Sequence, residues 1–190
     1  MAKTVLKISK IIQHGEPVLR EKAKEVPVSE IAGKKIKAVI ANMKSALAKE
    51  GDGVAIAAPQ IGLPVRVFVI SGKAFALDKN PEIDEKSASN KSKYPDVAFI
   101  NPKLTKLSKK QPYIVEGCLS VRWLYGKVKR AEKATVEAYD EKGKKFTRGA
   151  SGLLAQIFQH ETDHLDGILF IDKAKNVENI PPETIKTNNQ

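Results

Sequence analysis

Apolar side chains recur at helical spacing in two parts of the chain, and this pattern predicts two long amphipathic helices. In the first part, apolar residues follow one another at intervals of three and four, namely Ile36, Val39, Ile40, Met43 and Leu47. This spacing places them on one face of a helix. Because Ser29 is a typical cap and Gly51 a typical stop, we expect this helix over residues 30–49. A second helix is expected from about Ser151 to His164, ending before Gly167.

Shorter runs rich in β-branched residues predict strands between and after these helices. Residues 65–70 form one such run, and further strand-like segments cover residues 97–100, 112–116 and 127–139. Residues 140–143 resemble the turn of a hairpin that returns through residues 144–147, whereas the polar residues 72–96 predict a long exposed loop. Together these elements predict an α+β fold, with short antiparallel or mixed strands packed around a central helix.

Length and composition favour one globular domain in a reducing compartment. The 190 residues include 42% hydrophobic residues and one cysteine, Cys118, which excludes an intrachain disulfide. We expect a single domain over residues 1–175 and a polar, flexible tail over residues 176–190. Lys7 and Lys10 interrupt the first apolar residues, so a secretory signal is not expected. No apolar run is long enough to span a membrane. The expected location is the cytoplasm of a bacterial-type cell.

The charge balance is strongly basic, with 33 Lys and Arg against 22 Asp and Glu and a net charge of +11. Such a charge suits transient contact with an anionic neighbour such as a ribosome surface. The lysines are scattered along the chain and no aromatic stripe accompanies them, so recognition of a specific nucleic-acid sequence is not expected. A solvated lysine-rich surface is the simpler interpretation.

Two of the three histidines lie in one pentapeptide, residues 160–164, which reads HETDH. On a helix that turns about 100° per residue, His160 and His164 point within roughly 40° of each other, one turn apart. Two imidazoles in this arrangement are typical ligands of a divalent cation, with Glu161 within reach of a bound water molecule. Such short motifs also arise by chance, so two partly exposed structural histidines remain an alternative.

A catalytic metal in this arrangement needs a third protein ligand. Cys118, which follows a glycine, is one candidate, and its alternative interpretation is a small buried hydrophobe. A downstream carboxylate, as in zincin metallopeptidases, is the other candidate. Glu178 and Glu183 are the glutamates that follow the helix, and Glu183 lies in the polar tail. Spacing therefore favours Cys118.

Three segments in this order resemble the signature motifs of the peptide deformylase family. They are Gly53–Gln60 (GVAIAAPQ), Glu116–Ser120 (EGCLS) and Gln159–His164 (QHETDH). The resemblance covers roughly residues 10–172 and extends to Gly15–Arg20 and Arg130–Lys133. It implies a metal-dependent hydrolase that removes the formyl group from the N-terminal N-formylmethionine of nascent polypeptides.

The resemblance also implies a ligand set and a proton carrier. Cys118, His160 and His164 would hold one divalent metal, usually Fe²⁺ in the family, with Zn²⁺, Ni²⁺ or Co²⁺ able to replace it. Glu161 would take a proton from water and pass it to the leaving amine. A thiolate and two imidazoles suit several of these ions on chemical grounds alone.

The remaining implied roles concern the substrate. The side-chain amide of Gln60 and the backbone N–H of Leu119 would donate hydrogen bonds to the oxyanion that forms at the formyl carbon. Val54, Leu153 and Ile157 would line an apolar pocket for the methionine side chain. Val54 and Leu153 follow the family pattern, whereas Ile157 is placed by its position on the helical face.

Two departures from the family pattern affect the expected activity. Ala55 stands where the first motif normally has its second glycine, and its methyl group either crowds the substrate or is accommodated by the backbone. Residues 120–123 read SVRW, where many members have Ile-Pro after the serine. Two alternatives therefore accompany the deformylase interpretation. They are a zincin-type metallopeptidase and a ribosome-binding relative with low activity.

Overall fold

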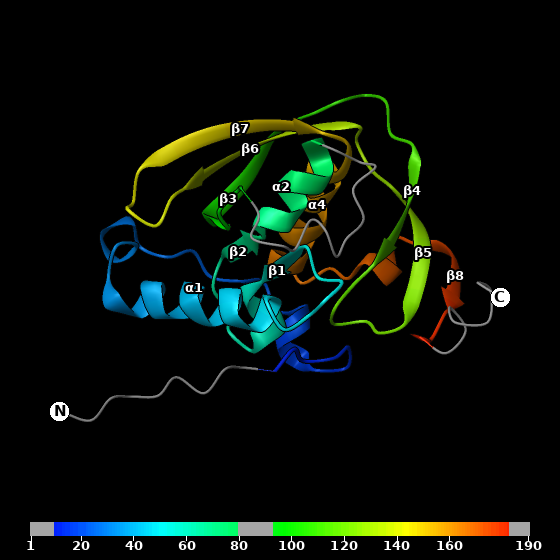
Figure 1. Cartoon of the computed structure of the whole chain (residues 1–190), viewed down its shortest axis with the longest axis horizontal. Helices are drawn as coiled ribbons and strands as arrows, with labels where there is room; N and C mark the ends of the chain where they lie inside the picture. The colour runs from blue at the N-terminus through cyan, green and yellow to red at the C-terminus, as the bar shows by residue number, and fades with distance from the viewer. Residues whose placement is uncertain (1–9, 80–92, 183–190) are drawn as a thin grey trace.

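Helix α4 (Gly152–Leu165) runs through the middle of the molecule, with one sheet arching over it and a smaller sheet beside it (Figure 1). The structure is a computed structural model that describes residues 10–79 and 93–182. The other helices in these ranges are α1 (Lys34–Leu47) and α2 (Gly72–Lys79). The strands are β1 (Ala55–Ala57), β2 (Val67–Ile70), β3 (Val97–Leu107), β4 (Tyr113–Gly117), β5 (Leu124–Lys129), β6 (Lys133–Tyr139), β7 (Lys145–Ser151) and β8 (Lys175–Asn179).

The strands form two sheets in which every neighbouring pair is antiparallel. The larger sheet has the order β1-β2-β3-β6-β7, and the smaller one has the order β4-β5-β8. Helix α4 packs against the larger sheet, chiefly against β6, β1 and β7. The predicted α+β class, with antiparallel strands around a central helix, is confirmed.

Strand β2 shows why residues 67–70 are apolar without alternation. Phe68 and Ile70 belong to the core on the α4 side of the sheet, whereas Val67 and Val69 belong to the core on the α1 side. All four side chains are fully buried. A strand covered on both faces needs apolar residues at every position, which explains the continuous run.

Aromatic packing fixes α4 relative to this sheet. Phe99 on β3 stacks on Phe68 with 4.7 Å between ring centroids, and its centroid lies 5.4 Å from that of Phe158 on α4. All three rings are fully buried. Burial of side chains of this size stabilises a fold by about 1.5–3 kcal/mol each. The helix that carries His160 and His164 is therefore held in a rigid position.

The two long helices lie close to their predicted positions, although their first residues differ. Helix α1 begins after Gly33, because residues 28–30 form a separate 3-10 turn. Ser29 is therefore not its cap. Helix α4 is preceded by Ser151, as predicted, and Gly167 takes the positive φ of 76° that suits a glycine after a helix.

Several other boundaries differ from the sequence-based prediction. Residues 72–79 form α2, where a loop was expected, because Ala74 and Phe75 pack into the core and Ser71 Oγ accepts the Ala74 N–H. A helix of eight residues is too short to show clear periodicity. Strand β3 continues to Leu107, and residues 127–139 contain parts of two strands instead of one. Residues 80–92 lie outside the described ranges.

The hairpin prediction is confirmed, whereas the expected C-terminal tail differs over its first residues. Strands β6 and β7 pair through the turn at residues 140–143, where Gly143 has a φ of 79°. Lys175–Asn179 forms β8, an edge strand whose side chains are all exposed. Backbone pairing with β5 holds this strand, so its sequence carries no hydrophobic pattern. Residues 183–190 lie outside the described ranges.

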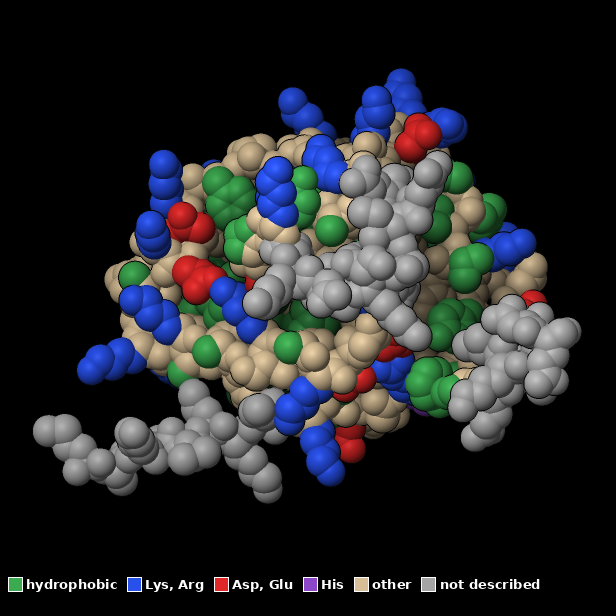
Figure 2. Space-filling view, in the orientation of Figure 1, with side chains coloured by type: hydrophobic (Ala, Val, Ile, Leu, Met, Phe, Trp, Pro, Cys, Tyr) green, Lys and Arg blue, Asp and Glu red, His purple; other side chains and the backbone are tan. Residues whose placement is uncertain are grey.

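The basic charge is scattered over one face of the molecule. Lys and Arg side chains are spread over the face shown in Figure 2 and do not gather in one patch there. Within residues 10–79 and 93–182, no helix has the length and apolar character needed to cross a membrane.

Candidate metal centre

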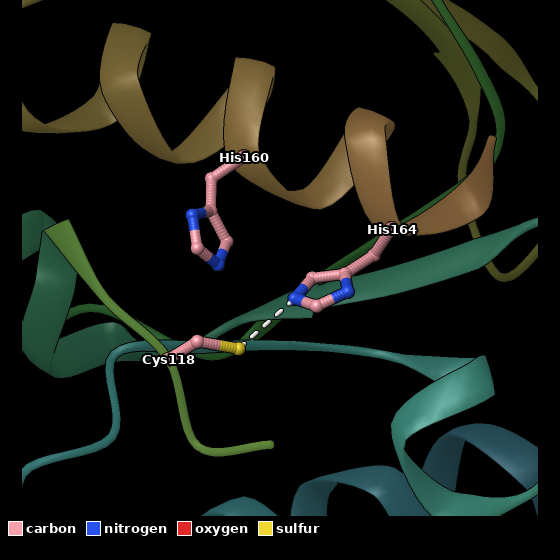
Figure 3. Close-up of side chains that lie close together, drawn as sticks. All are labelled: Cys118, His160 and His164. Atoms are coloured by element: carbon pink, nitrogen blue, oxygen red, sulfur yellow. Dashed lines mark hydrogen bonds between the residues drawn. The ribbon is translucent and has the colours of Figure 1, made fainter. Parts of the chain in front are cut away.

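Three side chains with metal-binding atoms meet between α4 and the end of β4. Cys118 directly follows β4, and His160 and His164 lie one turn apart on α4. One ligand atom from each residue lies within 4.8 Å of the others, and both imidazoles point toward Cys118 (Figure 3). Cys118 Sγ is 3.1 Å from His164 Nε2. One thiol and two imidazoles form a donor set that suits Zn²⁺, Fe²⁺, Co²⁺ or Ni²⁺.

A buried ion-pair network orients the first histidine. His160 Nδ1 lies 3.0 Å from Glu116 Oε2, and Arg130 donates two hydrogen bonds of 2.8 and 2.9 Å to the same carboxylate. Arg130 also donates to Asp163 at 2.6 Å. Burial by itself raises the pKa of Glu116, but the hydrogen bonds from Arg130 and His160 outweigh it and lower the pKa to about 2. An ionised Glu116 keeps the proton of His160 on Nδ1, which leaves Nε2 free to face Cys118.

Two buried polar atoms beside this cluster have no hydrogen-bond partner among the described residues, Glu161 Oε2 and His164 Nδ1. Such atoms are rare in folded proteins, and here they lie on residues of the predicted metal motif. Burial raises the pKa of Glu161 to about 7. A carboxyl group with a pKa near neutrality is suited to accept and return a proton. The surroundings of the cluster therefore fit a bound metal and a reacting water molecule.

Gln60 also lies beside the cluster. Its Oε1 accepts the backbone N–H of Ala57 at 2.8 Å, which fixes the orientation of the amide. Its Nε2 then donates toward Cys118 Sγ at 3.5 Å and Ser120 Oγ at 3.2 Å. Because the side chain is buried with a fixed orientation, Gln60 presents an N–H donor beside the cluster.

A cavity of about 340 Å³ opens onto this cluster. Val54, Leu153 and Ile157 contribute apolar side chains to its wall, and Ala55 and Leu119 also line it. The volume is at the lower end of the range for small-molecule sites. The structure thus brings all nine sequence-predicted site residues to one cavity or to the cluster beside it.

Ala55 takes an ordinary backbone conformation. It begins β1, pairs with Ile70 and is 7% exposed, and it is not among the described residues with positive φ. The glycine of the family pattern is therefore not required at this position for backbone freedom.

Ion pairs tie together the two segments that border the cavity mouth. Arg122 donates to both carboxylate oxygens of Asp52 and lies 2.7 Å from Glu50 Oε2. Its guanidinium also lies 4.8 Å from the centre of the Trp123 ring. The SVRW segment, which departs from the family pattern, thus connects the Cys118 side of the mouth to the loop before Val54.

Of the two alternative third ligands, Glu178 does not join the cluster. Glu178 lies exposed on β8, opposite Tyr125, and the group of close metal-binding atoms among the described residues contains Cys118 instead. Glu183 lies outside the described ranges.

Comparison with known proteins decides the family. A sequence model described as polypeptide deformylase matches residues 8–179. The chain belongs to the polypeptide deformylase family. The resemblance predicted from the three motifs is thereby confirmed.

Relatives in this family come from plants and bacteria. The chain is 37% identical over 180 residues to peptide deformylase 1A, chloroplastic/mitochondrial, of Arabidopsis thaliana, an alignment covering 95% of this chain and 64% of that protein. It therefore spans less than two thirds of this plant deformylase. It is 39% identical over 169 residues to the peptide deformylase of Christiangramia forsetii, covering 88% of this chain and 82% of that one.

The fold agrees with solved deformylase structures. A crystal structure of Arabidopsis thaliana peptide deformylase 1B in complex with an inhibitor matches with a TM-score of 0.73 and 32% identity. The match covers 88% of this chain and 82% of that one.

Sequence reasoning missed the residues that support the centre. Glu116 and Arg130 both lie in segments that resemble the family, yet neither was given a role. Their separation of 14 residues gives no periodic signal, because β4 and β5 bring them together through a hairpin. No local pattern marks the pair, because Glu116 is the one buried residue of a largely exposed strand and Arg130 lies just beyond β5.

Proposed function

We propose that this protein is a peptide deformylase, which hydrolyses the formyl group from N-formylmethionine at the start of newly made polypeptides. The observation that carries this proposal is the cluster of Cys118, His160 and His164 beside Glu161 and Gln60 at the end of an apolar cavity. Membership of the deformylase family supports the same function.

In this proposal Cys118, His160 and His164 hold one divalent metal. When bound, the metal would supply Lewis-acid chemistry, which makes water a stronger nucleophile near neutral pH. The family resemblance favours Fe²⁺, with Zn²⁺, Ni²⁺ or Co²⁺ as substitutes. Glu116 contributes by holding the ring of His160 through Nδ1.

The protein's own groups then move the proton and stabilise the charge. Glu161 takes a proton from the attacking water as the water oxygen bonds to the formyl carbon. Gln60 Nε2 and the Leu119 N–H donate to the carbonyl oxygen, which becomes negatively charged. As the C–N bond breaks, Glu161 returns its proton to the leaving nitrogen, and formate and a free methionine amine result.

The cavity accounts for the proposed substrate. Val54, Leu153 and Ile157 offer an apolar wall that suits the unbranched side chain of methionine. The small formyl group fits beside the cluster, where Glu161 and Gln60 are buried.

The cellular setting belongs to the same proposal. A thiolate ligand keeps its metal-binding form in a reducing compartment, which supports a cytoplasmic location. The net charge of +11 supports transient contact with the ribosome, where formylated chains emerge.

The direct test measures formate release from formyl-Met-Ala-Ser by the chain loaded anaerobically with Fe²⁺. The matched control is Glu161→Gln, which preserves size and hydrogen bonding but does not accept the proton. We expect this variant to retain its metal and to lose turnover by about 10²–10⁴-fold. Unchanged turnover at full metal content would contradict the role of Glu161.

A second variant separates this proposal from a zincin-type peptidase. Cys118→Ala removes one of three protein ligands, so bound metal measured by elemental analysis should fall sharply. A full complement of metal in this variant would contradict the ligand set.

A further inference from the structure

The smaller sheet presents a row of lysines beside the cavity. Residues directly opposite one another in an antiparallel pair point to the same face. The opposing pairs of β4 and β5 are Tyr113 with Lys129, Val115 with Lys127, and Gly117 with Tyr125. Strand β8 places Lys175 opposite Lys127. We name Tyr113, Val115, Lys127, Lys129 and Lys175 the lysine face.

This face is exposed and carries excess positive charge. Tyr113 and Val115 are 50% and 58% exposed, unusually high values for large apolar side chains, and all three lysines are exposed. Lys175 Nζ lies 5.3 Å from the centre of the Tyr113 ring. Among the described residues, no carboxylate forms an ion pair with any of the three lysines.

The lysine face is continuous with the cavity. Val115 belongs to both, and Gly117 and Tyr125 line the cavity at the end of the same row. A Cβ atom at Gly117 would lie 2.6 Å from the Tyr125 ring, so glycine allows this ring to pack on the strand next to Cys118. The row of side chains that begins at the cavity with Tyr125 therefore continues directly to the lysines.

Strand geometry sets the scale of this surface. Val115 and Tyr113 precede Cys118 by three and five residues. At about 3.4 Å per residue, they lie roughly 10 and 17 Å from Cys118 along the strand. An extended peptide covers the same distances with three to five residues.

We propose that the lysine face binds the downstream part of the polypeptide substrate and favours acidic side chains at about the third to fifth residues after formylmethionine. This inference rests on the proposed deformylase function. Lys127, Lys129 and Lys175 provide the attraction for carboxylates, and Val115 and Tyr113 provide apolar contact for the peptide between them. Glu178, opposite Tyr125, is an acidic residue at the cavity end of the face. Because it repels other carboxylates, acidic substrate residues nearer the methionine should raise kcat/KM less.

The test compares two hexapeptides of equal length, formyl-Met-Ala-Ser-Glu-Glu-Glu and formyl-Met-Ala-Ser-Gln-Gln-Gln. At low ionic strength the acidic peptide should have a kcat/KM roughly threefold to tenfold higher, the size expected of three exposed charge pairs. The higher kcat/KM should come mainly from a lower KM. The difference between the two peptides should disappear at about 0.5 M salt, where charges are screened within a few ångströms.

Two charge-matched variants localise the effect. Lys127→Glu/Lys129→Glu/Lys175→Glu should abolish or reverse the preference for the acidic peptide. The control is Lys34→Glu/Lys35→Glu/Lys37→Glu, which makes the same change in net charge on exposed residues at the start of α1. The control should keep the preference, and both variants should process formyl-Met-Ala-Ser at the unmodified rate.

Equal kcat/KM values for the two hexapeptides at low salt would overturn the inference. An equal change in the preference for the acidic peptide in both variants would also overturn it. A single-stranded RNA that binds the unmodified chain but not the lysine-face variant, without a peptide preference, would assign the face to RNA instead. Failure of the deformylase function itself is recognised separately, because formyl-Met-Ala-Ser would then release no formate.

Discussion

Replacement of Arg130 by methionine should destabilise the protein strongly, because it leaves a buried carboxylate without its main partner. The side chains of Arg130 and Glu116 are only 4% and 1% exposed. Removing one member of such a buried pair typically costs about 3–5 kcal/mol. For a chain of 190 residues, each kcal/mol lowers the melting temperature by about 2–4 °C. The expected decrease is therefore about 6–20 °C.

A double variant distinguishes loss of the ion pair from loss of packing. Arg130→Met/Glu116→Leu replaces both charges by apolar side chains and should regain much of the lost melting temperature. It also removes the carboxylate that holds His160 Nδ1, so its metal affinity should stay about 10–100-fold reduced. Thermal unfolding and metal titration of both variants measure the two effects. If Arg130→Met melts within about 2 °C of the unmodified protein, the buried ion pair does not contribute the expected stability.

Three further predictions concern the mouth, the first motif and an exposed ion pair. Arg122→Gln should raise KM for formyl-Met-Ala-Ser more than it lowers kcat, since the contacts to Asp52 border the cavity without reaching the cluster; an equal loss in both parameters would contradict this. Ala55→Gly should leave kcat/KM within about twofold and lower the melting temperature by about 1–4 °C, through unfolded-state entropy; a clear rise in kcat/KM would instead show that the methyl crowds the substrate. The hydrogen bond from Arg20 holds the pKa of Asp172 below its usual value. The stability gained from this pair is therefore present above that usual value and lost as the pH falls through the lowered pKa. Arg20→Gln should have a slightly lower melting temperature than the unmodified protein at pH 7, and the two temperatures should become equal in acid below the lowered pKa. A difference that persists there would contradict the assignment.

The sequence predicted those parts of the fold that depend on local periodicity. Residues 34–47 and 152–165 show helical spacing over several turns, and both are helices in the structure. Residues 72–79 escaped prediction because α2 has only two turns and owes its position to Phe75 in the core. Residues 175–179 escaped it because β8 is held by backbone pairing while its side chains face solvent.

The candidate site shows the same division between local and long-range information. His160 and His164 are linked by helical spacing, so their proximity follows from the sequence. The approach of Cys118 was inferred from chemistry and resemblance, since 42 residues separate it from His160. The contact between Glu116 and Arg130 depends on the pairing of β4 with β5, and that between Arg122 and Asp52 joins the segment after Cys118 to the loop before β1. No local pattern reports such contacts.

The proposed deformylase activity removes a formyl group and leaves the peptide bonds intact. The most direct measurement follows formyl-Met-Ala-Ser and its unformylated counterpart by mass spectrometry, with the chain fully loaded with Fe²⁺ under anaerobic conditions. The proposed activity predicts formate and intact Met-Ala-Ser in equal amounts from the first peptide, and no change in the second. Cleavage of a peptide bond in either substrate, or an unchanged formyl peptide in the presence of fully loaded protein, would contradict it.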